Sequence, residues 1–250
     1  KAGLDDTRGT LFYDYVRVLK EVQPQVFIYE NVFGLLKHDK GKTWKVIQEV
    51  FESLGYHYKY EVLDSRDYGI PQGRRRVFVV GFKDEEKLSK FHFPSKRELI
   101  YTMQDFLQDN VDLGKFLSVN GNITLLPSDG EQVEEKYFLS EKLLKYCLSP
   151  GTKNFMHKDA KIDLPIARAL LSTMGNHHRS SVNNYVTTNG RVRSLTTREA
   201  HRLMGFTDDY KIVVSKAQAY KQAGNSIVVD VLIAIMNEIN KVMGWDNGKN

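Results

Sequence analysis

Apolar residues first recur at helical spacing and then gather in short runs typical of strands. Side chains of one helical face are apolar over residues 10–22 and again over residues 43–54. A short apolar run after Pro24, over residues 26–29, is interpreted as a buried parallel strand. Alternation over residues 56–63 and a β-branched run over residues 77–80 predict two further strands. Helix and strand therefore alternate along this part of the chain.

This alternation is typical of a doubly wound α/β sheet, of which three strands form only a part. The following region, residues 84–172, has little periodicity apart from a capped helix predicted over residues 140–148. We therefore expect residues 1–83 to form part of an α/β domain and residues 84–210 to form a smaller mixed domain. Residues 211–250 are predicted as helices that return to the first domain.

Helix-start signals cluster near the carboxyl end of the chain. Thr196 and Glu199 have the spacing of a capping box, and the helix they open is expected to end near Gly205. Ser215 is predicted to cap a second helix. Residues 224–226 are expected to start a long apolar helix, where free backbone N–H groups would either bind an anionic ligand group or form an ordinary cap.

The composition narrows the classes of protein to which this chain can belong. The 250 residues carry a formal net charge of +5, which favours an anionic partner such as nucleic acid, although many enzymes are as basic. The single cysteine, Cys147, excludes an intramolecular disulfide and indicates a reducing compartment. Its helical surroundings predict a buried structural thiol. No apolar run reaches membrane-spanning length, and the sequence starts at Lys1 without methionine, as expected for a fragment.

Glu30 follows the apolar run and would stand at the carboxyl end of a strand, where ligands bind in open α/β sheets. Partial desolvation would raise the pKa of this carboxyl group and let it offer a proton near neutral pH. The alternative is a surface acid at a corner between strand and loop.

Three consecutive arginines, residues 74–76, follow a glycine-containing loop. Arginine suits bidentate recognition of phosphate or base edges, and on a strand Arg74 and Arg76 would share one face. A solvated basic turn is the alternative. His177, His178 and Arg179 form a polar cluster suited to base-edge contacts, and the absence of a third ligand argues against a metal site there.

Five segments follow one another in a fixed order: Arg-Gly-Thr-Leu-Phe at 8–12, Glu-Asn-Val at 30–32, Gln-Gly-Arg-Arg-Arg at 72–76, the segment at 193–206 and Tyr-Lys-Gln-Ala-Gly-Asn-Ser at 220–226. Together they resemble the C5-cytosine DNA methyltransferases over nearly the whole chain. The resemblance implies a partial Rossmann-like sheet of the S-adenosylmethionine-dependent methyltransferases and a target-recognition domain. It also implies transfer of a methyl group to C5 of a flipped cytosine in double-stranded DNA.

The resemblance also assigns roles to residues. It implies that Glu30 binds N3 and the 4-amino group of cytosine, and that Arg74 and Arg76 contact the base and the adjoining phosphate. Leu11, Asn225 and Ser226 match cofactor-binding positions for S-adenosylmethionine. Residues of the target-recognition region are expected to contact DNA: Arg168, His177, His178, Arg179, Arg191 and Arg193.

Two family motifs are absent, namely the Phe-x-Gly-x-Gly cofactor loop and the Pro-Cys dipeptide that bears the nucleophile. Cys147 is not preceded by proline. The chain is therefore expected to be inactive alone, with the nucleophile supplied by an amino-terminal segment or a second chain. The implied setting is restriction–modification or epigenetic methylation at the nucleoid in a bacterial cytoplasm. The rival interpretations are a non-catalytic DNA-binding relative and a tRNA methyltransferase, whose Cys-Phe-Thr tripeptide is absent here.

Overall fold

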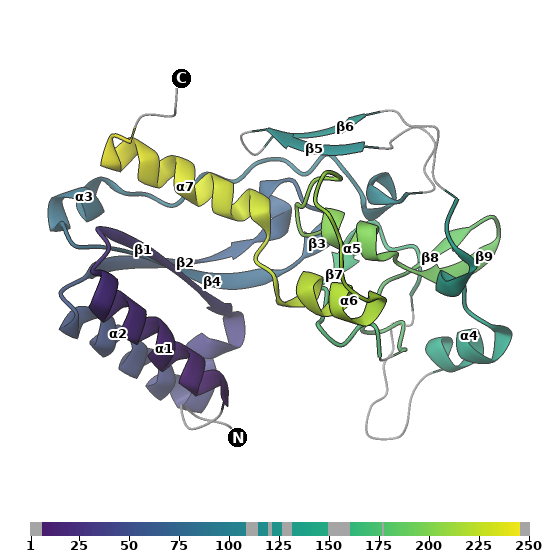
Figure 1. Cartoon of the computed structure of the whole chain (residues 1–250), viewed down its shortest axis with the longest axis horizontal. Coiled ribbons are helices and arrows are strands. Elements are labelled where there is room, and N and C mark those ends of the chain that lie inside the picture. The colour runs from purple at the N-terminus through teal and green to yellow at the C-terminus, as the bar shows by residue number, and fades with distance from the viewer. Residues whose placement is uncertain are drawn as a thin grey trace. The chain divides into compact units, whose positions relative to one another are not determined.

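The computed structural model describes residues 7–108, 115–119, 122–126, 132–149, 161–176 and 178–245 (Figure 1). It divides into two compact units. The first comprises Lys1–Leu63, Arg75–Pro94 and Ile235–Asn250, and the second comprises Asp64–Arg74 and Ser95–Ala234. This division differs from the predicted domains in two ways. The second unit includes the loop that ends at Arg74, the first of the three arginines. It also includes most of the predicted carboxyl-terminal helices, as far as Ala234.

The first unit alternates helices and strands, as predicted from the spacing of apolar residues. Its elements are α1 (Thr7–Val22), β1 (Val26–Val32), η1 (Phe33–Gly41), α2 (Lys42–Ser53), β2 (His57–Asp64), β4 (Arg75–Phe82), α3 (Glu85–Lys90) and the end of α7 (Val229–Met243). Gly55, at a φ of +73°, follows α2 in the left-handed conformation that a helix end favours.

The described strands of this unit form a sheet in the order β1-β4-β2. β1 pairs with β4 in an antiparallel register that places Val32 opposite Arg76. The predicted parallel pairing of this strand is therefore wrong. An apolar run reports that a strand is buried, but the direction of its partner depends on a segment more than forty residues away.

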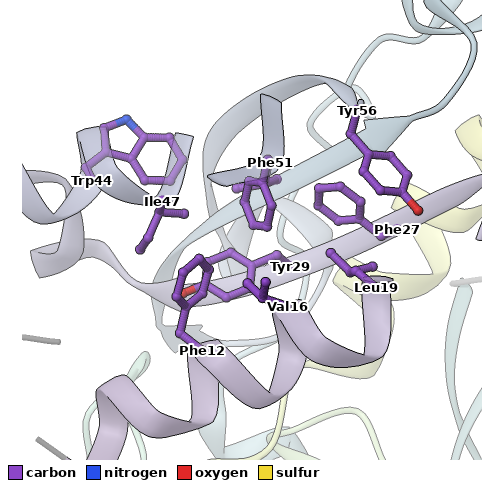
Figure 2. Packing of buried hydrophobic residues seen from close by; sticks show 10 residues of the cluster. Phe12, Val16, Leu19, Phe27, Tyr29, Trp44, Ile47, Phe51 and Tyr56 are labelled. Atoms are coloured by element: carbon purple, nitrogen blue, oxygen red, sulfur yellow. The ribbon is translucent and has the colours of Figure 1, made fainter. Parts of the chain in front are cut away.

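The core of the first unit is a cluster of aromatic rings between α1, β1 and α2. Phe51 is fully buried, and its ring centre lies 4.7 Å from that of Phe27 and 5.9 Å from that of Phe12. Figure 2 shows these rings with Val16 and Leu19, which α1 turns toward the strand. Such edge-to-face and tilted pairs stabilise a core beyond their buried area. The cluster fixes β1 and, with it, the corner that carries Glu30.

The second unit combines short strands and short helices, as expected for the mixed domain. Its elements are η2 (Ser65–Tyr68), β3 (Gln72–Gly73), η3 (Met103–Phe106), β5 (Lys115–Val119), β6 (Asn122–Leu126), η4 (Glu135–Tyr137), α4 (Glu141–Leu148), β7 (Ala167–Arg168), β8 (Tyr185–Thr188), β9 (Arg191–Ser194), α5 (Thr197–Arg202), α6 (Lys216–Asn225) and the start of α7. Pairs β5-β6 and β8-β9 are antiparallel, whereas β3-β7 is parallel. Within the described ranges, no helix is long and apolar enough to cross a bilayer.

The local capping signals are confirmed. The Thr196 side chain accepts the Glu199 N–H, and the Glu199 side chain accepts the Thr196 N–H, which completes the capping box of α5. At the amino termini of α4 and α6, the Ser140 side chain accepts the Leu143 N–H and the Ser215 side chain accepts the Gln218 N–H. These caps depend only on residues within one helical turn, which is why the sequence alone predicts them.

The carboxylate of Glu199 does more than close this capping box. It is fully buried and forms a bidentate ion pair with the fully buried guanidinium of Arg193, with both N–O distances at 2.8 Å. The Gln108 N–H donates to the same carboxylate at 2.9 Å. A buried carboxylate is tolerated at such a position because its oxygens are paired and hydrogen-bonded.

We predict that Glu199→Gln destabilises the protein by about 3–5 kcal/mol, because it leaves the Arg193 charge buried without its counter-charge. Urea unfolding followed by circular dichroism measures this change. Glu135→Gln is the matched control, since it breaks the exposed pair with Arg191 and is expected to change stability little. Equal unfolding midpoints for the two variants would contradict the prediction.

Candidate active site

Two of the predicted catalytic residues meet in the first unit. Glu30 lies two residues before Val32 on the same face of β1, and Arg76 of β4 lies opposite Val32. This register makes Glu30 and Arg76 diagonal neighbours, and the Arg76 Nε atom lies 3.1 Å from the Glu30 Oε1 atom. The side chains are 17% and 18% exposed, so the ion pair is shielded from bulk water while remaining accessible at its edge.

The electrostatics of the pair follow from this partial burial. Burial lowers the pKa of the Arg76 guanidinium, and the adjacent Glu30 carboxylate opposes that shift. A guanidinium nevertheless stays charged in proteins, so Arg76 provides a fixed positive charge beside Glu30. The arrangement presents a carboxylate oriented by a planar donor. The rise in the pKa of Glu30 that its position suggested stays a prediction.

The residues around the pair make this end of β1 rigid. Asn31 donates from its amide nitrogen to the Tyr29 hydroxyl at 2.7 Å, and its amide oxygen accepts the Val32 N–H at 2.8 Å. Arg75, which is exposed, lies with its guanidinium 4.5 Å from the centre of the Phe33 ring. Asn31 therefore holds the end of β1 through these two hydrogen bonds, and Arg75 covers Phe33, the first residue after β1.

Arg74 is not on the strand that carries Arg76, so the predicted common strand face does not apply to it. It precedes β4, is 4% exposed and donates to the carbonyl oxygens of Leu170, Gly224 and Ser226 at 2.9, 3.0 and 2.9 Å. These bonds tie the end of α6 to the loop after β7. The predicted contact of Arg74 with base and phosphate is not tested directly, but this burial argues for a positioning role.

Of the predicted cofactor residues, Asn225 and Ser226 occupy a different local structure from the one expected. Residues 224 and 225 are the last of α6, and the Ser226 N–H donates to the Ala223 carbonyl. The apolar helix begins at Val229, so the predicted amino-terminal anion site at residues 224–226 is wrong. The carboxyl end of α6 presents carbonyl oxygens, and Arg74 donates to two of them, those of Gly224 and Ser226. In the first unit, Leu11 is 67% exposed on α1 and thus accessible.

Arg193 is brought into the core of the second unit and not to its surface. It is 0% exposed and its guanidinium is bound by Glu199 and by the Thr188 hydroxyl. This placement argues against the predicted DNA contact. A polar cluster in sequence does not reveal whether an arginine is paired inside a fold, and the capping-box glutamate nearby was the one available signal.

Two other predicted DNA-binding arginines lie at the surface with aromatic partners. Arg179 stacks 4.0 Å from the centre of the Tyr146 ring and donates to the Tyr146 carbonyl at 3.1 Å. Arg191 is exposed, lies 4.3 Å from the centre of the Phe138 ring and pairs with Glu135. Both guanidinium groups are therefore held in defined positions on the second unit.

The remaining predicted DNA contacts lie near β7 and β8. Arg168 is half-buried, and its backbone N–H and C=O groups bond the side chain of Asn184. His178 is half-buried and its Nδ1 atom lies 3.3 Å from the Tyr185 hydroxyl. His177 lies outside the described residues. No group of three or more metal-ligating side chains occurs in the described ranges.

Sequence reasoning missed the structural importance of Gln72. This side chain is fully buried, donates to the Leu203 carbonyl at 2.6 Å and accepts the Leu170 N–H at 2.9 Å. It thereby joins the loop before the arginines to α5 and to the loop after β7. Its proximity to the arginine triplet was the only sequence signal.

Cys147 is buried, as predicted, and its Sγ atom lies 3.5 Å from the Tyr185 hydroxyl. Burial raises the pKa of the thiol. Because the thiolate is the nucleophilic form, this environment disfavours covalent catalysis by Cys147.

Comparison with solved structures identifies the fold as that of methyltransferases. The Entamoeba histolytica methyltransferase EhMeth superposes with a TM-score of 0.68 at 16% sequence identity, over 96% of this chain and 70% of that chain. The S. pombe Dnmt2 methyltransferase superposes with a TM-score of 0.66 at 16% identity, over 94% of this chain and 72% of that chain.

The chain belongs to the C-5 cytosine-specific DNA methylase family, which it matches over residues 1–241. Among the curated relatives, the Type II methyltransferase M.SsoII of Shigella sonnei is 34% identical over 246 residues, which cover 96% of this chain and 59% of the relative. The Type II methyltransferase M.HhaI of Haemophilus parahaemolyticus is 31% identical over 243 residues, which cover 97% of this chain and 71% of the relative. The predicted family and fold class are confirmed.

Gly224 provides a test of how the end of α6 is packed. A methyl group added there would overlap the backbone of Leu171 and Ser172, which cannot move aside as a flexible side chain can. We predict that Gly224→Ala destabilises the protein by about 1–3 kcal/mol or more, measured by urea unfolding. Gly73→Ala is the control, because the added methyl would meet only the Ala167 carbonyl at an ordinary 3.8 Å. A Gly224→Ala variant as stable as the control would refute the close approach.

Proposed function

We propose that this chain supplies the base-binding and target-recognition parts of a DNA cytosine-5 methyltransferase. The observation that carries the proposal is the ion pair of Glu30 with Arg76 at the end of β1. Family membership supports it. The substrate is cytosine in a specific sequence of double-stranded DNA, and restriction–modification is the setting that the Type II relatives favour.

Glu30 performs the step that prepares the base. Its carboxyl group binds N3 and the 4-amino group of cytosine and favours the form protonated at N3. Protonation withdraws electrons from the ring and makes C6 electrophilic. Arg76 orients the carboxylate throughout, because its Nε atom lies 3.1 Å from the Glu30 Oε1 atom. The base must leave the helical stack to reach this carboxyl group.

Each unit by itself offers side chains of a kind that suits part of S-adenosylmethionine. In the first unit, exposed Leu11 offers an apolar surface that suits an adenine ring. In the second unit, exposed Asn225 and half-buried Ser226 offer an amide and a hydroxyl that suit an amino-acid group. The cofactor, when bound, supplies the electrophilic methyl group. Arg74 holds the backbone of residues 224 and 226 and so positions Asn225.

The nucleophile belongs to a polypeptide segment other than this sequence. Attack on C6 requires a thiolate, and the sole cysteine of the printed sequence, Cys147, is buried with a raised thiol pKa. We infer that a Pro-Cys segment, either joined to this chain or on a second chain, completes the site. The DNA contacts that remain in the proposal come from Arg168, His178, Arg179 and Arg191.

Methyl transfer from labelled S-adenosylmethionine to mixed-sequence DNA tests this function. We expect no transfer by this chain alone and transfer after addition of a segment that carries the cofactor loop and Pro-Cys. The Cys147→Ala variant should keep its activity in the mixture, because Cys147 takes no part in the chemistry. Activity of the chain alone, lost on Cys147→Ala, would overturn the assignment of the nucleophile. DNA binding without transfer in the mixture would contradict the enzymatic proposal.

In the active mixture, Glu30→Gln is expected to lower kcat by about 10²–10⁴-fold, because a neutral amide lacks the negative charge that favours the form of cytosine protonated at N3. DNA affinity is expected to change far less, since the substitution leaves the target-recognition residues intact. Steady-state kinetics and fluorescence anisotropy measure the two effects. Glu49→Gln, on the exposed side of α2, is the control. Equal losses in turnover and DNA affinity would count against the proposed role.

A further inference from the structure

The second unit contains a pocket to which the proposed function assigns no role. Its volume is about 500 Å³, and the residues that line it come from η4, α5, the following loop and the start of α6. Three of its lining residues are basic, namely Lys136, Arg198 and Lys216, and one, Glu134, is acidic. Gln108 and Thr197 add uncharged polar groups to the wall.

The two lysines of this pocket gather around one aromatic ring. The Lys216 Nζ atom lies 4.2 Å from the centre of the Tyr137 ring, and the Lys136 Nζ atom lies 5.4 Å from it. The Lys216 ammonium also donates to the Lys136 carbonyl at 3.1 Å. The Tyr137 hydroxyl lies 3.4 Å from the Thr197 hydroxyl. Both ammonium groups therefore lie near the same ring, and cation–π contacts do not neutralise them.

The protein itself places an anionic oxygen beside one of these ammonium groups. The Glu134 Oε1 atom lies 2.7 Å from the Lys136 Nζ atom, and both side chains are more than half exposed. Such an exposed pair is worth little and can open at small cost. Burial and the nearby Lys136 lower the pKa of Lys216, so a second negative charge in the pocket would relieve unfavourable electrostatics.

Arg198 completes the basic wall on the α5 side. It is half-buried and donates to the carbonyl oxygens of Thr207 and Tyr210, at 3.3 and 2.8 Å, which hold the guanidinium in place. A guanidinium has five N–H donors in a planar fork, so the two carbonyls do not use its full capacity. A guanidinium that lines the same pocket as two ammonium groups suits the negative charge and the oxygen atoms of a phosphate group.

We propose that this pocket binds a phosphate group through Lys136, Arg198 and Lys216, with Glu134 as the side chain that the phosphate displaces. A free phosphate-type anion and a phosphodiester of the DNA backbone present the same chemistry to these residues. The proposal is independent of the methyl-transfer function, since none of these residues belongs to the candidate active site.

Isothermal titration calorimetry of the whole chain with inorganic pyrophosphate at low ionic strength tests the site. We expect saturable binding, and an affinity reduced about tenfold by Lys216→Gln and by Lys136→Gln, because each removes a charge-assisted contact. Glu134→Gln should raise the affinity, since it removes the competing carboxylate. Lys221→Gln should leave it unchanged, because Lys221 is an exposed lysine of α6 outside the pocket.

A second measurement distinguishes the two sources of phosphate. Displacement of a fluorescent DNA duplex by pyrophosphate, lost in Lys216→Gln, assigns the pocket to the DNA backbone. Saturable pyrophosphate binding without displacement assigns it to a small anion. The proposal is overturned if pyrophosphate does not bind saturably, or if Lys216→Gln and Lys221→Gln weaken binding equally.

Discussion

A single buried carboxylate, that of Glu199, organises much of the second unit. Its two oxygens accept from both terminal nitrogens of Arg193 and from the backbone N–H groups of Gln108 and Thr196. Removal of a carboxylate from water is costly, and only this complete set of donors makes the position tolerable. The hydrogen bonds to this carboxylate therefore join β9, the start of α5 and the segment that ends at Gln108. Because α5 also carries Arg198 and leads to the Leu203 carbonyl that binds Gln72, the polar pocket and the arginine loop both depend on it.

The arginine triplet shows how one sequence motif can serve three purposes. Arg74 is buried and binds backbone carbonyls at the end of α6, whereas Arg75 is exposed against Phe33. Arg76 alone pairs with Glu30. The buried member secures the segment that carries Asn225, and the third member orients the carboxylate.

The sequence predicted those features that depend on local spacing. The helices α1 and α2 follow from apolar periodicity, and the capping box at Thr196 follows from residues one turn apart. The partner of β1 could not be predicted in this way, because its direction is set by a strand far along the chain.

The same limit explains the outcome for the candidate site. Glu30 was found because an acid directly after a buried run stands out, and family resemblance added Arg76. Arg193 was misplaced because its burial depends on its pairing with Glu199 and on the residues that surround the pair. The sequence did not predict that α6 ends at Asn225, because a glycine before an apolar run also marks a helix start.

The degree to which Glu30 and Arg76 are buried bears on the function proposed for them. The Arg193–Glu199 pair has no exposed surface, so no ligand can reach it, and its role is confined to stability. Exposed pairs such as Arg191 with Glu135 are weakened by water and salt. Glu30 and Arg76 lie between these extremes, at 17% and 18% exposure. A carboxylate with this degree of burial keeps its orientation through the arginine and has already lost part of its water. The proposed binding and release of a polar, planar base would require this intermediate burial.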